Sequence, residues 1–173
     1  MIEGYLDHVI IERGLSQNTV SAYRRDLRRY ADWCQKRRIA RVSDVTENDV
    51  ADFSASLRRP QESWGPLTAS SAARVVVAVR GFHRFAAAEG FTVVDPSTNV
   101  QPPSIGRRLP KALNYSDVER LLAACGDLES AAGLRDRALL ELLYGTGARV
   151  TEAVSLDVDD VDLTSLTVTV VGK

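Results

Sequence analysis

Apolar residues in the first ninety positions recur at steps of three and four, which is the period of an amphipathic helix. This spacing predicts four helices, over residues 2–13, 16–38, 46–59 and 68–89. The predicted inward faces carry Tyr5, Leu6, Val9 and Ile10; Val20, Tyr23, Leu27, Tyr30, Ala31 and Cys34; Val50, Phe53 and Leu57; and Val75, Val76, Val79, Phe82 and Phe85. Helices joined by short loops in a segment of about a hundred residues indicate an all-α domain.

Capping signals support the predicted helix ends. Gly14 and Gly90 follow the first and fourth helices, where glycine commonly ends a helix. Ser16 is a favourable N-cap for the second helix, and Thr46 is the expected start of the third. Thr68 stands at the start of the fourth helix, after a loop that contains two prolines.

The pattern changes after residue 90. Residues 91–112 show no apolar period and hold several prolines, so we expect a linker between a helical domain at 1–90 and a second domain at 113–173. In the second domain, Ser116 is the expected N-cap of a short helix, with Glu119 as its capping-box partner.

Two further elements are predicted in the second domain. Residues 134–144 are apolar enough to form a buried helix. Residues 166–171 alternate apolar side chains with threonine, which is typical of a strand. The second domain is therefore expected to be mixed α/β.

The net charge of −1 conceals an asymmetry along the chain. Residues 1–110 contain 16 Lys and Arg against 12 Asp and Glu, whereas residues 111–173 contain 6 against 11. A basic first part suggests an anionic partner, although an excess of this size is also within ordinary variation.

Composition excludes several classes of protein. No apolar run is long enough to cross a bilayer, and the N-terminus has no basic region of a signal peptide, so we expect a cytoplasmic protein without a membrane partner. Cys34 and Cys125 are far apart in the sequence and are expected to be reduced. With His8 and His83 isolated, no metal site is expected.

Basic and polar side chains gather on the second and fourth predicted helices. Arg24 and Arg28, and likewise Arg25 and Arg29, are four residues apart and form two adjacent rows. Helix N-termini and arginines both bind phosphate, so this design favours DNA or RNA; a solvated surface is the alternative. The candidate DNA-binding residues are Ser16, Asn18, Thr19, Arg24, Arg25, Arg28, Ser70, Ser71, Arg74, Arg80, Arg84, Arg107 and Arg108.

A second candidate site follows the helix predicted at 134–144. Gly145-Thr146-Gly147 permits a sharp turn, and Arg149 then lies near the start of the next helix. A planar guanidinium beside helix N–H groups suits a phosphate, especially one gaining charge during attack at phosphorus. The motif is short, so a surface arginine in an ordinary helix–turn–helix remains the alternative.

Several motifs along the whole chain resemble those of the tyrosine recombinases, most closely the XerC/XerD type and its XerD branch. They are Gly14-Leu15-Ser16-x-Asn18-Thr19-x-x-Ala22-Tyr23-x-x-Asp26-Leu27, Arg80-Gly81-Phe82-His83-x-Phe85, Asp95-Pro96, Leu109-Pro110-Lys111, Arg135-Asp136-Arg137-Ala138 and Leu143-Tyr144-x-Thr146-Gly147-x-Arg149-x-x-Glu152. The resemblance implies a four-helix, SAM-like core-binding domain, followed by the first part of a mixed α/β catalytic domain.

The resemblance also implies a reaction. Members of this family cut and rejoin double-stranded DNA through a 3′-phosphotyrosyl intermediate, without metal or cofactor. Arg149 falls at the first catalytic arginine, and Lys173 at the catalytic lysine of a β-hairpin, the expected general acid. The implied partners are XerC-like recombinase subunits in a tetramer on DNA and a cell-division DNA translocase, in the resolution of chromosome dimers.

The sequence departs from the family pattern in two places. Thr151 stands where the family usually has serine, and both residues carry a hydroxyl. The family also uses a His-x-x-Arg motif and a nucleophilic tyrosine after the lysine, and we find no match to either in these 173 residues. We therefore expect a truncated chain that binds DNA without cleaving it. The alternatives are a fragment of a phage or mobile-element integrase, a DNA-binding module, and a helical protein-interaction domain.

Overall fold

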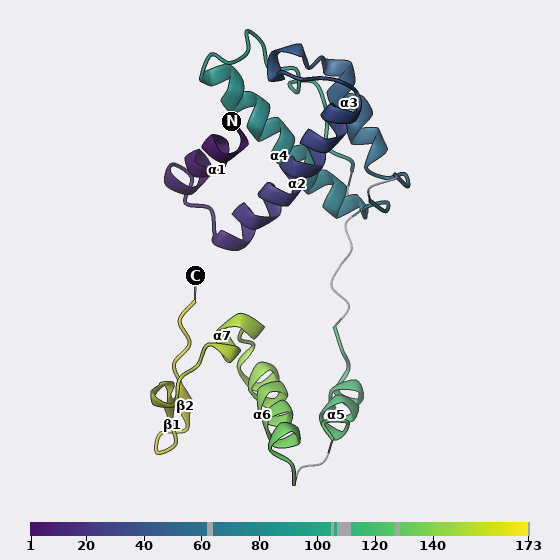
Figure 1. The fold of residues 1–173 in the computed structure, drawn as a ribbon. Helices are drawn as coiled ribbons and strands as arrows, with labels where there is room; N and C mark the ends of the chain where they lie inside the picture. Colours follow the sequence, from purple (N-terminus) through teal and green to yellow (C-terminus); the bar gives the residue numbers. More distant parts are fainter. Residues whose placement is uncertain (62–63, 105, 107–111, 127–128, 173) are drawn as a thin grey trace. The chain divides into compact units, whose positions relative to one another are not determined.

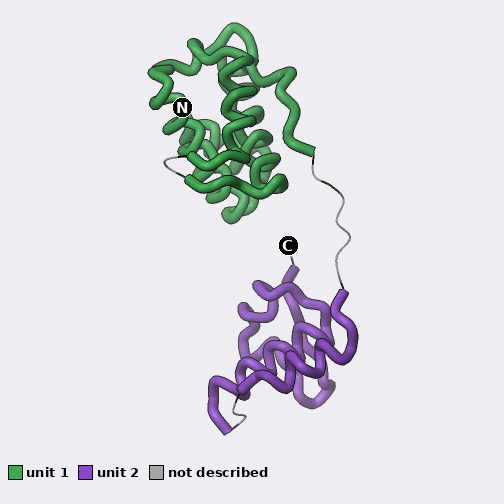
Figure 2. Tube along the Cα trace, turned by 90° about the vertical axis from the view of Figure 1, so that its right-hand side faces the viewer, with its two compact units in different colours: residues 1–108 green, residues 109–173 purple. Residues whose placement is uncertain are grey.

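The structure is a computed structural model that describes residues 1–61, 64–104, 106, 112–126 and 129–172. The chain divides into two compact units, residues 1–108 and residues 109–173 (Figure 2). Each unit is described separately below. The fold is the expected one, an all-α first unit followed by a unit that combines helices with a short β-hairpin.

The first unit consists of α1 (Ile2–Ile11), α2 (Gln17–Lys36), α3 (Glu47–Ser56) and α4 (Ala69–Ala88), with a short 3-10 turn, η1 (Val42–Asp44). The two long helices α2 and α4 pack against each other, and α1 packs against both (Figure 1). The four helices predicted from apolar spacing are all present, each within a few residues of its expected bounds.

One apolar core joins these helices. Tyr5, Leu6 and Val9 of α1 are buried as predicted, whereas Ile10 is 44% exposed. Ile10 was assigned to the inward face by its spacing, but the faces of α2 and α4 cover only one side of α1. The other large buried side chains include Leu27, Tyr30, Trp33, Val50, Phe53, Leu57, Val75, Val76, Val79 and Phe82.

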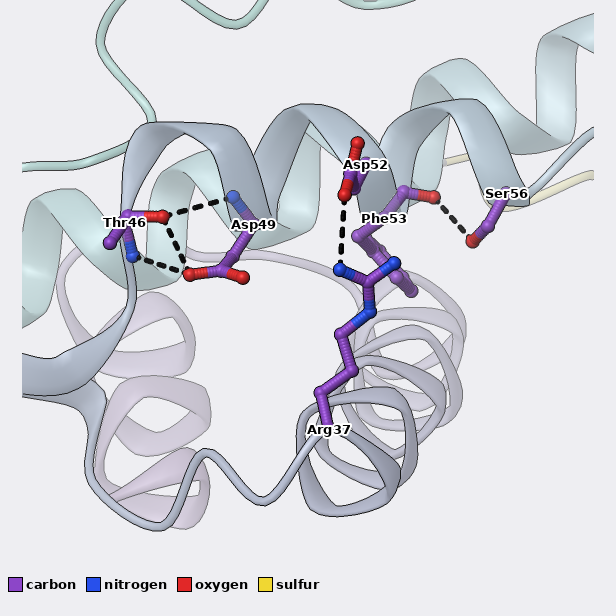
Figure 3. Close-up of polar contacts among 6 residues, drawn as sticks. All are labelled: Arg37, Thr46, Asp49, Asp52, Phe53 and Ser56. Atoms are coloured by element: carbon purple, nitrogen blue, oxygen red, sulfur yellow. Dashed lines mark hydrogen bonds and ion pairs between the residues drawn. The ribbon is translucent and has the colours of Figure 1, made fainter.

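Side-chain caps hold the N-termini of α2, α3 and α4, because the first N–H groups of a helix have no partner within it. Ser16 caps α2 and Thr68 caps α4, as predicted. Thr46 begins α3 in a reciprocal capping box with Asp49: the Asp49 amide donates to Thr46 Oγ1 at 3.2 Å, and the Thr46 amide donates to Asp49 Oδ2 at 2.9 Å (Figure 3). Local sequence therefore fixes where these helices start.

The end of α2 is tied to α3 by an ion pair between segments that are separate in sequence. Arg37 Nη1 lies 3.0 Å from Asp52 Oδ2 (Figure 3). The Arg37 guanidinium also lies 4.3 Å from the centroid of the Trp33 ring, a distance suited to a cation–π contact. Near the end of α3, the Ser56 hydroxyl donates to the Phe53 carbonyl at 2.7 Å.

Part of the segment predicted as a linker belongs to the first unit. Ser97 is fully buried, and both its amide and its hydroxyl donate to Asp95 Oδ1, at 2.8 and 2.6 Å. Val100 is buried against the core. Prolines in the sequence indicated an extended segment, but they do not prevent side chains on either side from packing onto a neighbouring helix.

The second unit contains α5 (Tyr115–Ala123), α6 (Ala131–Thr146), α7 (Val150–Val154) and a 3-10 turn, η2 (Val158–Asp160). A hairpin of β1 (Val161–Asp162) and β2 (Thr167–Val168) follows, antiparallel, with Val161 opposite Val168. The strand predicted at 166–171 is therefore present but shorter.

Two sequence-based expectations for this unit are wrong. Asn114, not Ser116, caps α5, and its Oδ1 accepts from the Asp117 amide at 2.8 Å. The α6 helix was expected to be buried, yet Leu134 and Tyr144 are 55% and 58% exposed. The reason is that α6 packs against α5 and α7, which cover only part of its apolar surface.

Candidate nucleic-acid interface

The N-terminus of α2 is closed by its own side chains. Ser16 Oγ accepts from the Thr19 amide at 3.4 Å and lies 3.0 Å from Thr19 Oγ1. Asn18, in the same turn, is exposed. The predicted polar turn is thus formed, with Asn18 as its most accessible side chain of the three.

The arginines of α2 have different environments. Arg24 pairs with Glu3 of α1 at 2.9 Å, so part of its charge is already compensated. Arg25 and Arg28 are exposed. Arg25, Arg28 and Arg29 line a hollow of about 250 Å³ together with Asp32 and Trp64. The Arg29 guanidinium lies 5.4 Å from the centroid of the Trp64 ring.

The hollow beside α2 is therefore a basic, partly aromatic surface. Its rim carries three arginines against one carboxylate, an arrangement that attracts phosphate. The aromatic contact orients one guanidinium without neutralising it. Sequence reasoning missed Trp64, because a tryptophan in a loop after two exposed arginines gives no periodic signal.

The start of α4 repeats the arrangement at the start of α2. Thr68 Oγ1 accepts from the Ser71 amide at 3.3 Å and lies 3.2 Å from Ser70 Oγ. One turn later, Arg74 Nη1 forms an ion pair with Asp26 Oδ2 of α2. The Arg74 side chain is 42% exposed, while that of Asp26 is 3% exposed.

Several of these arginines affect the pKa of the Asp26 carboxyl. Burial raises its pKa, and the positive charges of Arg74, Arg29 and Arg25 oppose that rise. Three of the predicted cationic side chains from α2 and α4 therefore act on one buried carboxylate. Arg25 and Arg74, two candidates far apart in the sequence, thus both act on the charge of Asp26.

Other predicted residues of α4 lie further along the helix. Arg80 is half-buried, and its Nη2 donates to the Thr98 carbonyl at 3.5 Å. Arg84 is exposed. Between them, His83 is fully buried, and its Nε2 lies 2.8 Å from the Tyr30 hydroxyl. Burial lowers the pKa of His83 to about 4, so the ring is neutral at pH 7.

The turn that carries Arg149 has the predicted form. Gly147 adopts a left-handed conformation, with φ of 67°, and its amide donates to the Leu143 carbonyl at 3.0 Å, which ends α6. Arg149 is the N-cap residue of α7, and its side chain is 75% exposed.

Glu152 holds the Arg149 side chain and backbone together. The Arg149 amide donates to Glu152 Oε2 at 2.9 Å, and Arg149 Nη1 donates to Glu152 Oε1 at 2.7 Å. These hydrogen bonds lower the pKa of the Glu152 carboxyl, and the one from the Arg149 backbone amide contributes most. Glu152 therefore orients the guanidinium while most of its donors stay accessible. Gly172 also approaches the Glu152 carboxylate: a Cβ at Gly172 would lie 3.7 Å from Oε1.

Three predicted residues, Arg107, Arg108 and Lys173, lie outside the described part of the chain. Within the described part, we find no cluster of His, Cys, Asp and Glu that could hold a metal ion. The same residues include no helix that is both long and apolar enough to cross a membrane.

Two protein-family models match the chain. The phage integrase N-terminal SAM-like domain covers residues 2–90, and the phage integrase family covers residues 111–173. The chain belongs to the phage integrase family of tyrosine recombinases. The first model spans α1 to α4 and the second contains the Arg149 turn, so both candidate surfaces lie within matched segments of this family.

Known relatives agree with this assignment. The tyrosine recombinase XerD of Mycobacterium tuberculosis strain H37Rv is 50% identical over 99% of this chain, and that of Mycobacterium leprae is 51% identical. The chain spans 57% and 56% of the length of these two relatives. An integrase from mycobacterium phage Brujita has the same fold, with a TM-score of 0.51 and 22% identity over the whole chain and 54% of that structure.

Proposed function

We propose that this chain binds double-stranded DNA as part of a Xer-type site-specific recombinase. The observation that supports the proposal is the gathering of arginines along α2: Arg25 and Arg29 line one hollow, and Arg74 of α4 is paired with Asp26 of α2. Together with the exposed Arg28, these side chains fit a phosphate backbone. The SAM-like domain match supplies the fold on which the surface lies.

In the proposed reaction, a tyrosine attacks a DNA phosphodiester and becomes joined to the 3′ phosphate. Arg149 stabilises the charge that develops on the phosphoryl oxygens, with Glu152 as its support. Lys173 donates a proton to the departing 5′ oxygen. The proposed biological role is chromosome-dimer resolution in the cytoplasm, with further recombinase subunits as partners on the DNA, and the similarity to tyrosine recombinases XerD supports it.

Residues 1–173 by themselves are proposed to bind DNA without cutting it. The sequence contains His8 and His83 and no His-x-x-Arg motif, and His83 is buried in the core. Tyr5 and Tyr30 are buried as well, which removes them as nucleophiles. An integrase of a mobile element would use the same chemistry, and the 50% identity to a tyrosine recombinase XerD supports the Xer-type role.

A salt titration of DNA binding tests the first part of the proposal. Arg25→Ala combined with Arg28→Ala should weaken binding to a mixed-sequence duplex about tenfold or more and reduce the slope of log affinity against log salt by about 2. Arg58→Ala combined with Arg59→Ala removes the same charge from exposed positions after α3 and should have a much smaller effect. Equal effects of the two double variants would refute the assigned surface, and no binding by the wild type at low salt would refute the function.

A chimera tests the role of Arg149. Residues 1–173 are joined to the remaining C-terminal residues of the Mycobacterium tuberculosis relative, and covalent capture of a nicked duplex bearing that relative's site is measured. Arg149→Ala should reduce capture about 10²- to 10³-fold while binding persists. Arg120→Ala, another exposed arginine of the same unit, is the matched control. Undiminished capture by the Arg149 variant would remove this residue from the active site.

A further inference from the structure

We propose that Asp26 is a positioning residue of the DNA interface, which holds the Arg74 guanidinium ready for a backbone phosphate. The inference rests on the proposed DNA-binding function and adds to it a residue that does not itself touch DNA. An acidic side chain beside a DNA surface normally weakens binding by repulsion. The geometry points to the opposite effect at this position.

Asp26 is buried, so its charge requires a partner inside the protein. That partner is Arg74, from a segment 48 residues away in sequence. The ion pair therefore joins α2 to α4 one to two turns after the N-cap of α4. With only 3% of its side chain exposed, Asp26 has little access to a duplex and acts on it through Arg74.

Arg74 can bind Asp26 and a DNA phosphate at the same time. A guanidinium carries five N–H donors in a rigid fork, and the bond to Asp26 uses Nη1. The side chain is 42% exposed, so part of it is open to a phosphate while Nη1 is bonded to Asp26. An arginine fixed in this way loses little conformational freedom when a phosphate arrives, which favours binding.

Two other acidic residues near α2 provide a contrast. Glu3 pairs with Arg24, but it is 59% exposed and the pair is therefore screened by solvent. Asp32 is exposed and lines the hollow that Arg25, Arg28 and Arg29 share. Asp32 is the matched control, because its removal deletes the same charge from the same helix without freeing Arg74.

The experiment measures affinity and salt dependence for a labelled mixed-sequence duplex, with folding of each variant checked by circular dichroism. Asp26→Asn should bind about three- to tenfold more weakly than the wild type, although it is one charge more positive. Arg74→Ala should lose a similar factor, and the double variant should be no weaker than Arg74→Ala alone. Arg74→Lys keeps the charge without the fork and should also bind more weakly. Asp32→Asn removes a carboxylate from the basic hollow itself and should bind more tightly, because it relieves repulsion of the phosphates.

Several outcomes would overturn the inference. They are wild-type or tighter binding by Asp26→Asn, additive losses in the double variant, or equal loss in Asp32→Asn. If Asp26→Asn does not fold, Arg74→Lys decides, and wild-type affinity in that variant refutes positioning by the guanidinium. Failure of the wild type to bind any duplex is a different result: it refutes the proposed function and this inference with it.

Discussion

The two units are similarly rich in apolar residues but bury them to different extents. In the first unit, α1, α2, α3 and α4 close around a common core that contains Phe53, Leu27 and Tyr30. In the described part of the second unit, Val118 and Ala153 are the buried apolar side chains, while large ones such as Leu134 and Tyr144 are more than half exposed. Apolar composition therefore produces a core only where enough faces converge, and packing sets the stability of the first unit far more than that of the second.

The two units also differ in where they place ionisable groups. The first unit buries Asp26 and His83, both with burial-shifted pKa values. In the second, two carboxyls have shifted pKa values, Glu152, which is half-buried, and Asp162, which is exposed, and local hydrogen bonds lower both pKa values. A change in pH should therefore alter the stability of the first unit through these buried groups and that of the second unit through hydrogen bonds in its turns.

The largest expected difference between the units comes from truncating an apolar side chain in each. Phe53→Ala removes a fully buried ring and should cost about 3–5 kcal/mol of unfolding free energy, because a cavity replaces its contacts. Leu134→Ala acts on a side chain that is 55% exposed and should cost less than about 1 kcal/mol.

Hydrogen exchange followed by mass spectrometry measures both effects, since its peptides report on each unit separately. Protection should fall throughout residues 1–61 in Phe53→Ala and hardly change in Leu134→Ala. Comparable losses in the two variants would contradict the contrast in packing.

These differences also explain what the sequence could predict. Helical period and capping residues located α1 to α4 because both signals are local: Ser16 and Thr68 cap through amides three residues away. The exposure of α6 depends on tertiary packing. An apolar stretch shows that a helix would be stabilised by burial, but it does not show which other elements cover that helix. The Asn114 cap was missed because Ser116, two residues later, has an equally favourable side chain.

The same limit applies to the candidate site. Four-residue spacing placed Arg24 and Arg28 in one row on α2. It did not distinguish Arg24, which pairs with Glu3, from Arg28, which lines the basic hollow. The bond between Arg74 and Asp26 crosses 48 residues of sequence and has no periodic signature. Spacing along a helix predicts neighbours on that helix, whereas ion pairs between helices depend on their packing.

A second test of the contrast uses pH. Burial lowers the pKa of His83 to about 4, against an ordinary value of 6.5, so the folded state favours the neutral ring. The unfolded chain then takes up a proton first as pH falls. The stability due to neutral His83 is complete above pH 6.5 and is lost progressively as pH falls through 4, to a limit of about 3 kcal/mol.

Chemical denaturation at a series of pH values, followed in each unit by hydrogen exchange, measures this loss. His83→Gln cannot ionise and serves as the reference, which isolates the histidine from the opposing titration of Asp26. The pKa values of Glu152 and Asp162 are lowered, so these carboxyls keep their charge and their hydrogen bonds in the upper part of this pH range. Their titration should therefore not change the stability of the second unit until the pH is lower still. An equal pH dependence in wild type and His83→Gln would exclude the histidine as the source.

The smallest expected effect, and the one that differs in sign between the units, comes from replacing a helical glycine by alanine. At Gly81 of α4, an added Cβ would meet the Tyr5 hydroxyl, and Tyr5 is held between Phe82 and Phe85. Gly81→Ala should therefore destabilise the first unit by about 1–3 kcal/mol, because the buried ring and α1 must shift.

Gly145 near the end of α6 is the matched position, because no atom lies within 4 Å of a Cβ built there. Alanine restricts the unfolded chain and favours a helix, so Gly145→Ala should stabilise α6 by about 0.5–1 kcal/mol. Both glycines are helical, so intrinsic propensity predicts the same gain at each, and the difference in sign isolates the effect of packing. If Gly81→Ala stabilised the first unit, Tyr5 would have to move without cost in free energy. The close fit of α1 against α4 would then not account for the better packing of the first unit.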